Sequence, residues 1–215
     1  MIEKLERLIE RSFDLHETIY GHVESLEPAP LPRADIAFDA GLLALEHATA
    51  ALELIDSGRV SSAFALMRPQ FESLVRGVWL AHAASDLWVE KLSQPLTLAA
   101  QRQANEGPML AEMLKQLETC PEAPAHIVAQ LKEYRDVSWK VLNSFNHGGI
   151  HPLSRSISGY PPKLLYDALR NSNAVLALTT QLLSIMSGDE TKMEPVRRIH
   201  LEFVDCLPII HGSSR

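Results

Sequence analysis

Three charged side chains that could bind an anion or pair with one another stand four residues apart: Arg68, Glu72 and Arg76. At this spacing they lie on one stripe of a helix, and most of their neighbours are apolar, so the stripe should be partly buried. One carboxylate cannot neutralise two guanidinium groups, and burying an unpaired charge costs several kcal/mol. We therefore expect an internal ion-pair network or a phosphate or nucleotide site; a solvated outer face is the third interpretation.

A second polar cluster, Asn143, Asn146 and His147, directly precedes the pair Gly148-Gly149. Spacings of three and four residues put these side chains on one face of a helix, which Gly148 would end in the left-handed conformation. The C-terminus of a helix favours the charged form of an imidazole. His147 could therefore act as a general acid or base, or could simply cap the last carbonyl groups.

Two further candidates lie in residues 148–161, which we predict to be an irregular segment. Arg155 could contact an anion and Tyr160 could belong to a lid over a small molecule, although both also suit an ordinary loop surface. His147 and His151 are four residues apart, but glycines and a proline interrupt any helix between them and no acidic ligand stands beside them. With no nucleotide-binding glycine loop or metal-binding motif in the chain, we predict no metal site and no cofactor.

Helices must position all of these residues. No segment alternates with period two, which excludes a sheet, and the sequence predicts an all-α fold: a single-domain up-and-down helical bundle of seven or eight helices spanning residues 1–215. The predicted helices cover about 2–26, 33–57, 60–84, 86–92, 96–118, 124–147 and 162–187, with a last helix after residue 189. The second of them has an alanine-rich face that allows close packing, formed by Ala37, Ala40, Ala44, Ala48 and Ala51.

The first helix, residues 1–26, carries a seam of apolar residues at spacings of three and four, with polar interruptions at Ser12 and His16. Such a seam can pack inside its own domain or against a second subunit. The second arrangement would place residues 1–26 at a dimer interface and predicts a homodimer.

Composition limits the partners. Hydrophobic residues make up 46% of the 215 residues and aromatic residues only 6%, a balance that favours helices filled by Leu, Ala, Val and Ile. The net charge is -7, and residues 1–57 hold 12 of the 27 acidic but only 4 of the 20 basic residues. An acidic N-terminal third does not favour DNA, whereas the nearly neutral remainder could hold a basic pocket for a small anion or RNA.

The cellular location is predicted from absences. Cys120 and Cys206 are far apart in the sequence, which excludes a disulfide framework and a zinc cluster and favours a reducing compartment. The N-terminus is charged from its third residue and is not a signal peptide. No apolar run approaches the roughly 20 residues of a membrane helix, so we predict a cytoplasmic protein with no membrane contact.

Two motifs support a resemblance. The pattern Arg68-Pro-x-Phe-Glu72-x-x-x-Arg76-x-x-Trp79-Leu80, followed by Asn143-x-x-x-His147-Gly-Gly, resembles an uncharacterised group of bacterial all-helical proteins, over residues 36–187. Some such proteins are similar to HEPN-type domains, dimeric bundles of toxin–antitoxin and phage-defence systems. The resemblance implies a regulatory or binding component of such a system.

The chain departs from active HEPN ribonucleases, which carry an arginine, four to six residues and then a histidine on a helix at the dimer interface. The positions that could hold this arginine before His147 are Lys140, Val141 and Leu142, and none of them is an arginine. This departure argues against ribonuclease activity of the HEPN type.

Three functional hypotheses follow. The first is a binding or regulatory component of a defence or toxin–antitoxin system. The second is an enzyme acting on a phosphate-containing substrate such as RNA, with His147 as the acid or base and Arg68 and Arg76 as anion clamps. The third is a structural oligomerisation module. An open pocket that gathers the arginines, Asn143 and His147 would favour the enzyme, and a closed, fully paired cluster would favour the other two.

Overall fold

The computed structural model describes residues 1–95, 97 and 107–208. In this part of the chain all regular structure is helical and no strand occurs, so the predicted all-α bundle is confirmed, with one or two more helices than expected. The α-helices of the described residues are α1 (Ile2–Val23), α2 (Pro32–Asp56), α3 (Val60–His82), α4 (Asp86–Leu92), α6 (Leu110–Thr119), α7 (Ala125–Asn146), α8 (Ile150–Ser158), α9 (Pro162–Met186) and α10 (Met193–Glu202).

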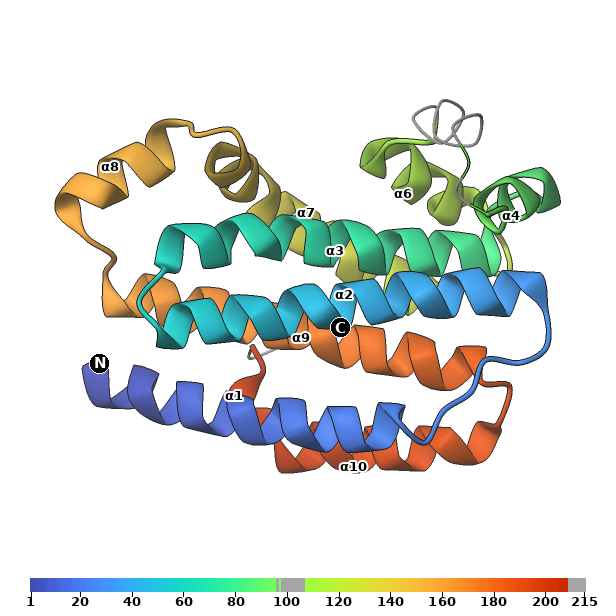
Figure 1. Cartoon of the computed structure of the whole chain (residues 1–215), viewed down its shortest axis with the longest axis horizontal. Coiled ribbons are helices and arrows are strands. Elements are labelled where there is room, and N and C mark those ends of the chain that lie inside the picture. Colours follow the sequence, from blue (N-terminus) through green and yellow to red (C-terminus); the bar gives the residue numbers. More distant parts are fainter. Residues whose placement is uncertain (96, 98–106, 209–215) are drawn as a thin grey trace, which may run out of the picture.

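Three long helices, α2, α3 and α9, run side by side through the middle of the bundle (Figure 1). Helices α1 and α10 cover α9 on one side, and α7 packs behind α3 (Figure 1). Helices α4 and α6 lie at one end of the bundle and α8 at the other (Figure 1). None of the described helices is apolar enough over a sufficient length to cross a membrane.

The central helices approach closely because small residues lie between them. A Cβ atom added at Gly77 of α3 would lie 2.6 Å from Cδ2 of Leu182, and one added at Gly41 of α2 would lie 2.7 Å from Cδ2 of Leu183. Real Cβ atoms do not come this close, so a larger residue at either position would force the leucine side chain of α9 to move, and at Gly77 it would also crowd the carbonyl of Ala37 at 3.2 Å. The predicted alanine-rich face of α2 contributes four fully buried residues to this packing: Ala37, Ala44, Ala48 and Ala51.

Two segments differ from the prediction. Residues 150–158, expected to be irregular, form helix α8, which begins after Gly149 with Pro152 in its first turn, where a proline needs no hydrogen-bond partner. Ser144 fastens its start, because the amide of His151 donates to Oγ of Ser144 at 3.1 Å. Of the helix expected over 96–118, residues 96 and 98–106 lie outside the described residues, and α6 begins at Leu110.

The seam of α1 packs inside the same chain, so the seam gives no support to a dimer interface. Helix α1 contacts α9, α2 and α10. In the seam, Ile2 is exposed, Leu5 and Ile9 are partly buried, and the later members are all buried: Ser12, His16, Ile19, Val23 and Leu26. Partners in the same chain therefore cover most of the apolar surface that would have joined a second subunit.

Hydrogen bonds satisfy Ser12 fully and His16 in part, the two polar interruptions of this seam. Oγ of Ser12 donates to the carbonyl of Leu8 at 2.7 Å and accepts from Nδ2 of Asn173 at 2.8 Å. Nδ1 of His16 pairs with Oγ1 of Thr49 at 3.1 Å, and its Nε2 has no hydrogen-bond partner among the described residues. Burial lowers the pKa of His16 to about 4, against the weaker opposite effect of Asn173.

A pH dependence of stability follows from His16. Burial lowers the pKa of His16 from 6.5 to about 4 in the folded state, so the folded protein resists protonation of this ring more than the unfolded chain does. The free energy of unfolding therefore has its full value above pH 6.5 and decreases as the pH falls toward 4. Replacing His16→Asn should therefore cost about 3 kcal/mol less at pH 4 than at pH 7. Urea unfolding at both values checks this, and the exposed His126→Gln should show no such difference.

Self-association stays a prediction, and the apolar seam of α1 no longer supports it. Light scattering at tens of micromolar protein should give twice the mass of one chain. A monomer mass at that concentration contradicts the expected homodimer, and the bundle would then carry all its core contacts within one chain.

Candidate functional site

Arg68 lies where α3 meets α7 and contacts three side chains. Its Nε donates to Oε1 of Glu72 at 3.1 Å, and its Nη2 forms an ion pair with the same oxygen at 3.0 Å. Its Nη1 lies 3.0 Å from Nε2 of His147, and its Cζ stands 4.9 Å from the ring centroid of Trp139. We call these four residues the Arg68 cluster. Arg68 therefore connects the charged stripe of α3 with the polar end of α7.

The hydrogen bond from Arg68 limits what His147 can do. A guanidinium group only donates hydrogen bonds, so Nε2 of His147 must accept and the ring is neutral in this arrangement. The lone pair that a general base needs is already occupied. The side chain points at Arg68 rather than capping the end of α7, where Gly148 adopts the expected left-handed conformation (φ +60°).

The two asparagines of α7 have separate roles. Asn143 lies midway between Trp139 and His147 on the same helical stripe, and its Oδ1 is buried without a hydrogen-bond partner in the described part of the chain. Asn146 instead ties α7 to α3: with its amide nitrogen turned toward them, it donates to the carbonyl groups of Leu142 and Ala65, each at 3.1 Å.

The two candidates after the glycine pair lie apart from this cluster. Arg155, on α8, is half-buried and forms no hydrogen bond or ion pair through its side chain with any described residue. Tyr160 is anchored: Oη lies 2.5 Å from Oγ of Ser61, and its ring packs on Phe64 and Phe145 with centroid distances of 5.9 and 6.3 Å. A tyrosine held in the core does not suit a mobile lid.

Arg76, one turn beyond Glu72, is the unpaired member of the stripe. It is half-buried, and no hydrogen bond or ion pair joins it to any residue that the structure describes. Burial lowers the pKa of its guanidinium, and the negative charge of Glu72 acts in the opposite direction. The uncompensated charge expected from the sequence therefore belongs to Arg76.

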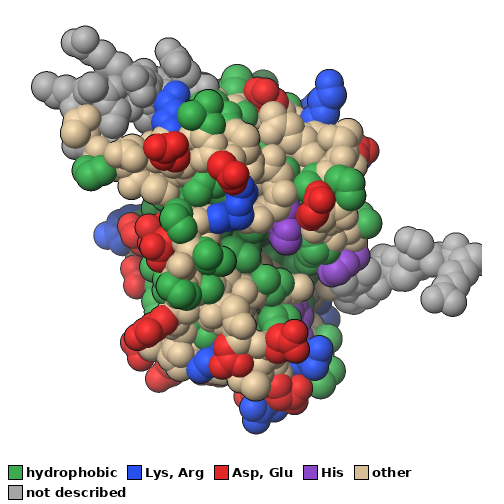
Figure 2. Space-filling model, turned by 90° about the vertical axis from the view of Figure 1, so that its right-hand side faces the viewer, with side chains coloured by type: hydrophobic (Ala, Val, Ile, Leu, Met, Phe, Trp, Pro, Cys, Tyr) green, Lys and Arg blue, Asp and Glu red, His purple; other side chains and the backbone are tan. Residues whose placement is uncertain are grey.

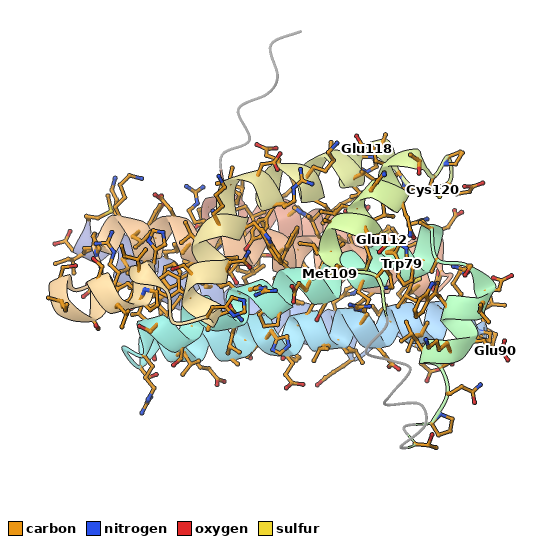
Figure 3. The ribbon with its side chains drawn as sticks, turned by 90° about the horizontal axis from the view of Figure 1, so that it is seen from above. Trp79, Glu90, Met109, Glu112, Glu118 and Cys120 are labelled. Carbon is orange, nitrogen blue, oxygen red and sulfur yellow. The ribbon has the colours of Figure 1, made fainter. Side chains whose placement is uncertain are left out.

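Arg76 faces a cavity of about 250 Å³ between α3 and the start of α6, which we call the Arg76 cavity. Figure 3 shows Met109, the N-cap residue of α6, and Glu112 of α6 over α3, near Trp79. A hydrogen bond of 2.7 Å from Nε1 of Trp79 to Oε1 of Gln116 fastens the two helices. Besides Arg76, the lining residues are Glu72, Gly107, Pro108, Met109, Leu110 and Met113.

The start of α6 adds positive character to the Arg76 cavity. Its N-cap residue, Met109, has no side-chain oxygen to accept from the first amides, and the first backbone hydrogen bonds of this helix come from Glu112 and Met113. The amide groups of the first turn and the guanidinium both favour an anion. The sequence identified Arg76 but not this wall, because nothing in the local pattern pairs residues 107–113 with α3.

The described residues offer no metal centre. They contain no group of three or more metal-ligating His, Cys, Asp or Glu side chains, and Cys120 and Cys206 are unpaired thiols. On the end of the bundle seen in Figure 2, acidic side chains lie between the basic ones, so the basic side chains form no continuous surface there. A small anion suits this molecule better than an extended nucleic acid on that face.

The ion pair between Arg68 and Glu72 should contribute modestly to stability. Their side chains are 20% and 34% exposed, so water still screens the pair, and we expect Glu72→Gln to cost about 1 kcal/mol. A fully buried pair would cost about 3–5 kcal/mol, the loss that the apolar sequence context indicates. Urea unfolding measures the difference, with exposed Glu46→Gln of α2 as the control that should change nothing.

Comparisons with known proteins give one result. A family of unknown function, DUF6988, matches residues 41–209, which include the Arg68 cluster and the Arg76 cavity but not α1. No curated protein and no solved structure matches the chain. The expectation of an uncharacterised family is confirmed, and the HEPN-like and bacterial parts of that expectation stay predictions. The chain belongs to the DUF6988 family.

Proposed function

We propose that this protein acts by binding an anionic ligand in the Arg76 cavity, as a regulatory or binding component of a bacterial defence or toxin–antitoxin system. One observation carries the proposal: a half-buried guanidinium, unpaired among the described residues, faces an open cavity. The assignment to a defence system rests on the resemblance of the two sequence motifs.

The free energy of binding would come from Arg76. A half-buried charge without a partner has lost part of its hydration and gained no compensating contact. A phosphate or carboxylate in the cavity would accept charge-assisted hydrogen bonds from the guanidinium. The first amides of α6 could donate to the same group. Glu72 also lines the cavity, and its carboxylate is paired with Arg68.

The contacts of His147 favour binding over catalysis. Its Nε2 accepts from Arg68, and Arg68 is in turn paired with Glu72. Arg68 therefore contacts both His147 and Glu72, an arrangement that supports a non-catalytic protein. An enzyme acting on RNA would need Arg68 to release His147 before the ring could accept a proton, and the Arg76 cavity does not include His147 among its lining residues.

The test is titration calorimetry of inorganic phosphate against the full chain. Replacing Arg76→Gln should weaken binding about tenfold or more, because hydrogen bonds to charged groups are worth about 1.5–3 kcal/mol. Arg155→Gln is the matched control: it removes an equally unpaired, half-buried arginine from α8, and it should leave the affinity unchanged. His147→Ala should also leave it unchanged.

Three results would contradict the proposal. Wild-type protein that binds no phosphate would leave Arg76 as a structural residue and favour the oligomerisation module. Loss of binding in Arg155→Gln or His147→Ala, with Arg76→Gln unaffected, would place the anion near the C-terminal end of α7 instead of in the Arg76 cavity. Cleavage of a short RNA that disappears in His147→Ala would establish the enzyme hypothesis instead.

A further inference from the structure

A second cavity, of about 240 Å³, lies between α7 and α9 and has a different chemistry. Phe71 of α3, Leu131 and Tyr134 of α7, and Val175 and Leu178 of α9 give it apolar walls. The rings of Phe71 and Tyr134 pack together with a centroid distance of 4.5 Å. Large apolar walls with a few polar groups are typical of a site for a small molecule.

The polar groups of this cavity would hold an uncharged ligand. Neither a lysine nor an arginine is among its lining residues, and His200 of α10 is the one lining side chain that can take up a positive charge. No permanent positive charge would therefore compensate an anion there. Burial raises the pKa of the Tyr134 phenol, despite a hydrogen bond with Ser138, so this ring stays neutral. Glu133, the one acidic lining residue, is an exposed residue of α7.

One buried acceptor lacks its hydrogen bond. Gln130 belongs to the cavity wall, and its Oε1 is buried without a partner among the described residues. An unsatisfied buried acceptor costs about 1–3 kcal/mol, and native structures keep few of them. A donor on a bound molecule would satisfy this oxygen.

We propose that the cavity between α7 and α9 binds a neutral, flat apolar molecule with one hydrogen-bond donor, about the size of two fused rings. A cavity of roughly 150 Å³ accommodates benzene, and the present volume of about 240 Å³ leaves room for a second ring. Phe71 and Tyr134 supply the aromatic wall, and Gln130 accepts from the donor. This site is independent of the anionic ligand proposed at Arg76.

The experiment compares indole with benzothiophene, which has nearly the same shape but no N–H group. In titrations against the full chain, wild type should bind indole about tenfold more tightly, because only indole can donate to Gln130. In Gln130→Leu the affinity for indole should fall to that for benzothiophene, so that the two become equal. Gln181→Leu makes the same change on α9 outside the cavity and should keep the wild-type ratio.

Two results would overturn this proposal. The first is wild-type protein that binds neither probe. The second is a preference for indole that stays unchanged in Gln130→Leu, provided that this variant is folded, as shown by a urea midpoint equal to that of wild type. Arg76→Gln should leave both affinities unchanged, so failure of the anion site and failure of this cavity can be told apart.

Discussion

The close approach of α2, α3 and α9 is the constraint on which the other features depend. Gly41 and Gly77 allow the leucines of α9 to sit where side chains would otherwise stand. Gly77 lies on the face of α3 that is turned toward α2 and α9. Arg76, about 100° away around the helix, lies on the side where α6 begins. There α6 and α7 cover α3 incompletely, and the charged stripe lies between core and solvent.

The sequence predicts most of the helices correctly because their apolar spacing and their glycine and proline ends agree with one another. It misses α8, where glycines and a proline stand close together and outweigh the apolar positions Ile150, Leu153 and Ile157, which no other helix buries. It also leaves the seam of α1 ambiguous. An apolar stripe specifies that it must be covered, but the same residues fit a partner in the same chain or in another.

The candidate site is predictable in composition and only partly in geometry. Arg68 and Arg76 have the same residue type, the same stripe and the same carboxylate between them, yet Glu72 pairs with Arg68 alone. The difference arises from α7, whose Trp139 and His147 hold the Arg68 side chain in place. The second wall at Arg76 comes from α6, and no pattern near residue 76 specifies which segment will pack there.

The two cavities meet at α3, where adjacent residues face different ligands. Phe71 belongs to the apolar cavity and Glu72 to the Arg76 cavity. Trp139 touches both neighbourhoods, since its ring lies 6.5 Å from that of Phe71 and 4.9 Å from the Arg68 guanidinium. Trp139 is thus packed between the two neighbourhoods, but it lines neither cavity. Each cavity has its own polar groups, so the chemistry of its ligand is set by the residues of one wall and not by those of the other.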